Sequence, residues 1–355
     1  MTLRYEISKN GYSNIRPVEI ASNISQNSLA ELNEKGSEFP GVNIVAKAIR
    51  TYTSGSLASH ILGYVGKIEK SELEGKENIY GLNDIIGKMG IEYVMEEYLK
   101  GKNGIRQIDM AVDGSITDEY VTEEAIAGAD VILTLDANLQ KVTEDTLKNS
   151  IQEIQTSAGV KVSGASAVVM KVKTGEVLAM ASYPDFDPSD FTGGISTDKW
   201  NYYTNKEQSE YARLHPFVNR AISSPSSPGS TYKMVTAITG LETGKIKIKE
   251  KINDTGRYTF YKDYQPYCWN KSGHGYLNVT DAIVKSCNYF FYEVGNRVGI
   301  QNLAKYSKAL GLGKKTGIEL LRRRGRKCVK PRNIKEIQYA MEWRKYACSS
   351  NWTRE

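Results

Sequence analysis

The chain has 355 residues, of which 40% are hydrophobic and 25% charged, with a formal net charge of +6 at neutral pH. This length and composition suit an ordinary globular protein of two domains with a sizeable core, and no internal repeat or low-complexity run appears. The sequence contains no apolar run of about 18 residues and no leader pattern, which excludes a recognisable membrane span or export signal.

The first 128 residues are expected to form an extended domain of mixed α and β structure. Hydrophobic spacing and turn residues predict a helix over residues 91–100 and strands at 105–110 and 115–121. A second domain is expected to start near residue 130.

The second domain opens with a predicted helix over residues 138–156 and a hairpin over residues 165–182. β-Branched residues alternate on both sides of Lys173-Thr174-Gly175, which is typical of two strands joined by a glycine turn. A long loop rich in Asp, Pro, Gly and Tyr then runs to about residue 218.

Ser230 and Lys233 stand three residues apart, after a proline and a glycine and before an apolar helical run. Positions i and i+3 share a helix face, so the amine can reach the hydroxyl if the helix starts at the serine. The helix N-terminus favours developing negative charge, and a lysine with a lowered pKa can act as the base for a nucleophilic serine. Ser196 and Lys199 repeat the spacing without the apolar helix.

Ser286 and Asn288 flank Cys287 between two apolar segments, at a predicted helix–loop–helix corner. A serine here can relay a proton between base and leaving group, and an asparagine amide can hold a substrate backbone amide. Ser25 and Asn27 form a similar pair in a polar stretch that lacks this context.

With both motifs in this order, the chain resembles the class B penicillin-binding proteins, whose signature is Ser-x-x-Lys, Ser-x-Asn and a Lys-Thr/Ser-Gly strand. The similarity runs from about residue 16 to about residue 320 and points to penicillin-binding protein 2 of cell elongation and its sporulation relatives. Further matching segments are Arg50–Tyr52, Ala58–Gly66, Gly87–Glu92, Arg106–Asp109 and Leu133–Asp136.

The resemblance implies an α+β fold with an extended pedestal (dimerisation-type) domain over residues 1–128. Residues 129–320 would be the N-terminal part of a serine transpeptidase domain of the β-lactamase-like kind, with helices packed on an antiparallel sheet. Glycosyltransferase and other elongation-complex partners would dock on residues 1–128. The implied location is the cell membrane, on its extracytoplasmic face. The missing anchor suggests a fragment, with a genuinely cytoplasmic homologue as the alternative.

The reaction implied by the resemblance is acyl transfer on peptidoglycan stem peptides that end in D-Ala-D-Ala. Ser230 would attack the penultimate D-alanine carbonyl with Lys233 as base, Ser286 would relay the proton to the departing D-alanine, and Asn288 would orient the substrate amide. β-Lactams would acylate Ser230 as mimics of that peptide, and no cofactor takes part. A serine β-lactamase or β-lactam sensor, or a non-catalytic elongation scaffold, are the alternatives.

The third motif departs from the family pattern. Lys173-Thr174-Gly175 and Lys271-Ser272-Gly273 precede Ser286, while Lys315-Thr316-Gly317 follows it too soon and resembles a loop of the family. The third-motif strand normally supplies one oxyanion donor, and losing such a donor costs on the order of 100- to 1000-fold in rate. We therefore expect this chain to be weakly active or inactive.

Residues 321–355 hold 11 of the 47 basic side chains but only 3 of the 41 acidic ones, so the basic balance of the chain lies in this tail. The tail shows no clear strand or helix period. We interpret it as non-family sequence from a frameshift or premature gene end. Binding of nucleic acid or anionic lipid is the alternative, and we predict no nucleic-acid partner.

Four cysteines and three histidines are scattered without ligand spacing, so no metal site is predicted. A disulfide between Cys268 and Cys287 stays open. His274, between two glycines, either shapes the cleft or packs a turn.

Overall fold

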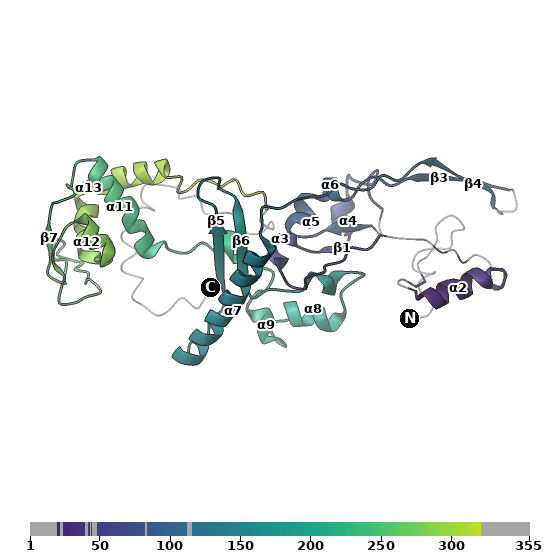
Figure 1. The fold of residues 1–355 in the computed structure, drawn as a ribbon, viewed down its shortest axis with the longest axis horizontal. Helices are drawn as coiled ribbons and strands as arrows, with labels where there is room; N and C mark the ends of the chain where they lie inside the picture. The colour runs from purple at the N-terminus through teal and green to yellow at the C-terminus, as the bar shows by residue number, and fades with distance from the viewer. Residues whose placement is uncertain are drawn as a thin grey trace. The chain divides into compact units, whose positions relative to one another are not determined.

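The computed structural model describes residues 20–21, 24–39, 42, 44, 48–81, 84–111 and 116–320 (Figure 1). Contacts divide the chain into two compact units, Met1–Ser223 and Ser224–Glu355. Within the described ranges, every helix is too short or too polar to span a bilayer. The basic tail predicted over residues 321–355 lies outside the described residues.

The first unit begins with short helices and two antiparallel hairpins, in which β1 pairs with β2 and β3 with β4. The second hairpin agrees with the predicted strands and forms a long ribbon in Figure 1. The helix predicted over residues 91–100 is divided, because the backbone of Met95 leaves the helical region at φ −102° and ψ 16°. The elements are α2 (Gln26–Glu34), a 3₁₀ turn (Gly36–Glu38), α3 (Ser59–Leu62), β1 (Val65–Lys67), α4 (Lys70–Leu73), β2 (Ile85–Gly87), α5 (Gly90–Val94), α6 (Glu96–Leu99), β3 (Ile105–Met110) and β4 (Ile116–Glu123).

Helix α7 packs on an antiparallel hairpin of β5 and β6. Gln140, buried in α7, fixes this contact, because its side chain donates to the carbonyl of Met180 at 2.9 Å and accepts the Met180 N–H at 2.7 Å. The predicted helix over 138–156 and hairpin over 165–182 are therefore both present. The elements are α7 (Ala137–Ala158), β5 (Ala165–Met170) and β6 (Val177–Tyr183).

An aromatic core lies in the same unit. Tyr64, Phe186, Phe191 and Tyr203 are buried together, with Tyr64 and Phe191 stacked at 4.0 Å between ring centroids. The turn-rich loop after β6 therefore supplies core residues. This core contains residues from both sides of the predicted domain boundary near residue 128. The first compact unit therefore extends beyond that boundary, to Ser223. The loop also forms a 3₁₀ turn (Pro188–Phe191), α8 (Thr197–Thr204), α9 (Glu210–Arg213) and α10 (Arg220–Ser223).

In the second unit, helix α11 packs against α13, and these lie close to α12 and β7 (Figure 1). Gly240 in α11 permits the close approach, because a Cβ there would lie 2.8 Å from Val294 Cγ1 of α13. Strand β7 pairs antiparallel with β8 beside these helices. The elements are the 3₁₀ turn η3 (Gly229–Thr231), α11 (Tyr232–Glu242), β7 (Ile252–Asp254), β8 (Gly275–Leu277), α12 (Val279–Val284) and α13 (Asn288–Ala309).

Candidate active site

Ser230 lies exposed in the 3₁₀ turn η3, directly before α11. The α-helix begins at Tyr232, two residues later than the sequence predicts, because Gly229 takes a left-handed φ of +56° and the Thr231 N–H and hydroxyl both donate to the Pro228 carbonyl. The hydroxyl of Ser230 is thereby presented to solvent at the N-terminal end of a helix, where the dipole favours negative charge.

Lys233 lies in the first turn of α11 and is half-buried. Its Nζ donates to the backbone carbonyl of Ser286 at 2.7 Å, to Ser286 Oγ at 3.0 Å and to Asn288 Oδ1 at 2.6 Å. Burial lowers the pKa of the Lys233 amine from its ordinary value, while the nearby cysteine sulfurs oppose this. A lysine with a lowered pKa loses its proton more readily and is better suited to act as a base.

Ser286 lies in the tight turn between α12 and α13, with a left-handed φ of +47° that is uncommon for a residue other than glycine. Its Oγ donates to Ser230 Oγ at 3.1 Å. The turn is held by the indole N–H of Trp269, which donates to the Lys285 carbonyl at 3.0 Å. Strained backbone of this kind persists only where the surroundings determine it, and it is common at functional sites.

The four residues predicted from the two motifs are therefore assembled in one place. A continuous chain of hydrogen bonds runs from Ser230 Oγ through Ser286 Oγ to Lys233 Nζ. In the described residues Lys233 bonds to Ser286 and Asn288, so its predicted link to Ser230 is made through Ser286. The arrangement can move a proton from a nucleophilic hydroxyl to an amine through a second hydroxyl.

A buried polar cluster lies directly behind this turn. Asp254 Oδ2 accepts from His274 Nδ1 at 2.7 Å and from Cys287 Sγ at 3.2 Å, and Cys268 Sγ lies 3.6 Å from His274 Nδ1. Burial acts to raise the Asp254 pKa, but hydrogen bonds from His274, Gly256 and the cysteines hold that pKa below its ordinary value. Burial raises the pKa of the Cys287 thiol to about 12.

Comparisons with known proteins identify the family of this chain. A family model described as the penicillin-binding protein dimerisation domain matches residues 2–133, and the penicillin-binding protein transpeptidase domain matches residues 165–336. The chain belongs to the penicillin-binding proteins. The predicted family and α+β fold class are thus confirmed.

This penicillin-binding protein is similar in sequence and in fold to proteins of peptidoglycan synthesis. It is 30% identical over 340 residues to the peptidoglycan D,D-transpeptidase MrdA of Acinetobacter baumannii, over 95% of this chain and 46% of that protein. A complex of penicillin-binding protein 2 with MreC from Helicobacter pylori has a TM-score of 0.69 at 30% identity, covering 84% of this chain and 52% of the other. A peptidoglycan synthase complex that coordinates polymerization and crosslinking has a TM-score of 0.72 at 28% identity, covering 89% and 54%. The chain thus spans about half the length of these relatives.

The buried cluster in this penicillin-binding protein is a feature that sequence spacing did not reveal. One ligand atom from each of Asp254, Cys268, His274 and Cys287 lies within 4.8 Å of all the others. The prediction of no metal site rested on the absence of a local ligand pattern, and it stays a prediction. The four residues show no such pattern because β7, the following loop, the edge of β8 and the start of α13 each contribute one of them. Gly273 beside His274 was the available signal, because a Cβ there would lie 2.2 Å from the Asp254 carbonyl oxygen, which marks a close backbone approach.

The donor set fits Zn²⁺, which prefers four ligands of nitrogen, sulfur and carboxylate oxygen. The His274 Nε2 atom is buried and has no hydrogen-bond partner among the described residues. The contacts of Nδ1 with Asp254 and Cys268 therefore orient the ring. With four protein ligands, such an ion would be structural: it would hold Cys287, and with it the Ser286 turn, against the β7–β8 hairpin.

The other Lys-Thr/Ser-Gly segments of this penicillin-binding protein lie in turns and loops. Lys173-Thr174-Gly175 forms the turn between β5 and β6, as predicted, and Lys315 is exposed in a segment without helix or strand. Lys271-Ser272-Gly273 lies in the loop before β8, and Gly273 has a φ of +77°. None of these three segments lies in a strand, so the assignments of the first two motifs do not depend on them.

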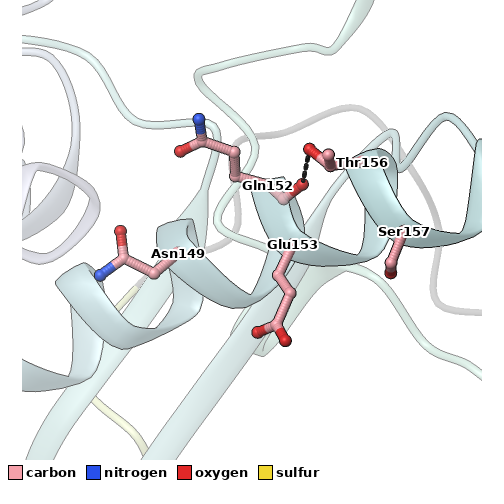
Figure 2. A pocket seen from close by; sticks show the side chains of 5 residues that line it. All are labelled: Asn149, Gln152, Glu153, Thr156 and Ser157. Atoms are coloured by element: carbon pink, nitrogen blue, oxygen red, sulfur yellow. Dashed lines mark hydrogen bonds between the residues drawn. The ribbon is translucent and has the colours of Figure 1, made fainter.

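A shallow hollow on α7 has no catalytic character. Figure 2 shows that its five labelled side chains all project from α7, and the Thr156 hydroxyl bonds back to the Gln152 carbonyl at 2.8 Å. These side chains are polar or acidic groups on one exposed helix face, so the hollow is an ordinary surface furrow.

Proposed function

We propose that this penicillin-binding protein is a serine D,D-transpeptidase that cross-links peptidoglycan stem peptides. The observation that supports this most directly is the hydrogen-bonded chain from Ser230 through Ser286 to Lys233. The Acinetobacter relative carries the name of this activity.

In the proposed reaction, Ser230 Oγ attacks the carbonyl carbon between the two terminal D-alanines, and its proton passes through Ser286 to neutral Lys233. The backbone N–H of Ser230 donates to the oxyanion, and the Asn288 amide orients the peptide. The C–N bond then breaks, and the proton returns through Ser286 to the departing D-alanine nitrogen. A stem-peptide amine attacks the ester carbonyl, forms the new amide and releases the Ser230 hydroxyl.

We further propose that residues 1–128 form the pedestal and residues 129–320 the transpeptidase part. The Helicobacter relative was solved with MreC, and another relative belongs to a peptidoglycan synthase complex. These relatives support partners of the elongation complex. We propose that such partners, including a glycosyltransferase, dock on the pedestal and that the protein is located at the outer face of the cell membrane. β-Lactams would bind as analogues of the stem peptide.

The test is covalent labelling of the purified chain by a fluorescent penicillin, with the modified residue located by mass spectrometry. We expect slow labelling of Ser230, complete loss in Ser230→Ala, and a stable ester. Ser196→Asn is the matched control, because Ser196 has the same spacing to a lysine and its oxygen caps α8, a role that asparagine retains. A folded chain that shows no Ser230 adduct after prolonged exposure would favour the scaffold alternative, and release of the label within minutes would favour a β-lactamase.

A further inference from the structure

Trp269 is held in place although it is 65% exposed, so burial in the core does not fix its side chain. The indole N–H donates to the Lys285 carbonyl at 3.0 Å, and the ring makes a T-shaped contact with buried His274, with 5.1 Å between centroids. The N–H of the preceding residue, Cys268, donates to the Gly256 carbonyl at 2.8 Å and fixes the backbone beneath the ring. The indole is therefore an ordered donor on the outside of the Ser286 turn.

The Lys285 carbonyl that receives this bond belongs to the peptide unit that leads into Ser286. The unit is planar, so its rotation changes ψ of Lys285 and φ of Ser286 together. A hydrogen bond to its carbonyl therefore restrains the left-handed φ of +47° at Ser286. The N–H of the same unit, on Ser286, donates to the Ile283 carbonyl at 3.0 Å. Trp269 and Ile283 thus hold the two polar ends of one peptide plane.

The peptide unit on the other side of Ser286 is held by different groups. Its carbonyl, on Ser286, accepts from Lys233 Nζ at 2.7 Å, and its N–H, on Cys287, donates to the Ala282 carbonyl at 2.9 Å. Lys233 changes its protonation state in the proposed reaction, whereas an indole N–H is a donor only. Trp269 therefore gives the turn a hydrogen bond that stays the same in either protonation state of the base.

We propose that Trp269 is a positioning residue for acylation, which acts through the Lys285 carbonyl on the hydroxyl of Ser286. That hydroxyl donates to Ser230 Oγ at 3.1 Å and accepts from Lys233 Nζ at 3.0 Å. The rotamers open to a side chain depend on its φ and ψ, so release of the peptide unit lets Ser286 Oγ leave the rotamer that reaches both partners. The effect on rate rests on the proposed function, whereas the effect on the turn does not.

The test compares variants of two exposed tryptophans in the full chain. Trp269→Phe keeps an aromatic ring beside His274 and removes the N–H donor. Replacement of Trp269 by β-(3-benzothienyl)alanine, in which sulfur stands in place of the N–H, removes the donor at nearly constant shape. Trp200→Phe is the matched control, because Trp200 is 42% exposed and its indole has no hydrogen-bond partner among the described residues.

Penicillin labelling of Ser230 over a range of penicillin concentrations separates the affinity of the non-covalent complex from the acylation rate constant. Both variants at position 269 should lower the rate constant about three- to tenfold, as expected for the loss of one hydrogen bond, and leave the affinity unchanged. Trp200→Phe should change neither quantity. A benzothienyl variant that acylates at the wild-type rate would show that the N–H is not needed and would overturn the proposal.

Hydrogen exchange of the peptide that covers residues 285–291 measures the turn without reference to catalysis. Both variants at position 269 should speed its exchange by about threefold or more and leave a peptide from α7 unchanged. If the wild-type chain does not label at Ser230, the proposed function fails, and exchange alone decides whether Trp269 holds the turn. Unchanged exchange over residues 285–291, or a change spread over the whole chain, overturns the inference.

Discussion

The left-handed backbone of Ser286 allows the effect of a substitution on stability to be measured apart from its effect on Ser230 acylation. A residue with a side chain in this region costs about 1–2 kcal/mol, whereas glycine avoids most of that cost and loses about 0.5–1 kcal/mol to a more flexible unfolded chain. We expect Ser286→Gly to be more stable than Ser286→Ala by roughly 0.5–1 kcal/mol. Both variants lack the hydroxyl and should lose Ser230 acylation alike. Urea unfolding and penicillin labelling of the pair measure the two effects, and equal stability would show that the turn is not strained.

The half-buried amine of Lys233 predicts how acylation depends on pH. In the proposed reaction the neutral amine is the base, and burial lowers its pKa, so the reactive fraction rises with pH and does so at lower pH than for an exposed lysine. We expect the rate of penicillin acylation to increase from neutral to mildly alkaline pH. Lys233→Arg should abolish acylation, because a guanidinium keeps its proton. A rate that falls over the same range would contradict the assignment of Lys233 as the base.

At the scale of the elements, the contact between α11 and α13 positions Lys233 against the Ser286 turn. Gly240→Ala would place a methyl group 2.8 Å from Val294 Cγ1 and 3.0 Å from Ile246. Overpacking costs about 1–3 kcal/mol, while the gain in helix propensity returns about 1 kcal/mol. We therefore expect net destabilisation of up to about 2 kcal/mol, measured by chemical denaturation.

Gly295→Ala is the matched control for this contact, because a Cβ at Gly295 in α13 would meet no atom within 4 Å. The same change should stabilise the chain by up to about 1 kcal/mol. Opposite signs for the two alanines would assign the cost to the α11–α13 packing, whereas two stabilising variants would mean that the helices can separate without loss.

Elements with a strong local pattern were predictable from the sequence, and those defined by contacts between distant residues were not. Helix α7 and the β5–β6 hairpin follow from periodicity, and the two short motifs identify Ser230 and Ser286 from their apolar surroundings. The cluster around Asp254 has no local pattern, because its members meet only when β7 pairs with β8 and the loop folds back. The late start of α11 depends on a 3₁₀ turn, which propensity does not distinguish from the first turn of an α-helix.

At the scale of the whole molecule, the segment that joins the two units leads directly to Ser230. Residues 224–229 are all exposed, and residues 224–228 form neither helix nor strand before η3 begins at Gly229. Exposed segments without buried contacts are the preferred sites of proteolytic cleavage. We expect a brief digestion with a protease of broad specificity to cut first within residues 224–229, as read from the intact masses of the two fragments. A first cut elsewhere in the described residues would show that this segment is protected.

The three hydrogen bonds of Lys233 have a consequence for the timing of the reaction. An ammonium group has three protons to donate, and in this protein all three go to the carbonyl and hydroxyl of Ser286 and to the amide oxygen of Asn288. The protonated amine of Lys233 thus links α11 to the turn between α12 and α13. When the amine gives up a proton to become a base, it keeps two protons for the Ser286 carbonyl and the Asn288 amide oxygen and gains a lone pair that can accept the Ser286 hydroxyl proton. The hydrogen bond between Ser286 Oγ and Lys233 Nζ then reverses its direction. In the proposed reaction Ser286 Oγ can accept the proton of Ser230 only after this reversal, so the loss of one proton from Lys233 sets the direction of the whole relay.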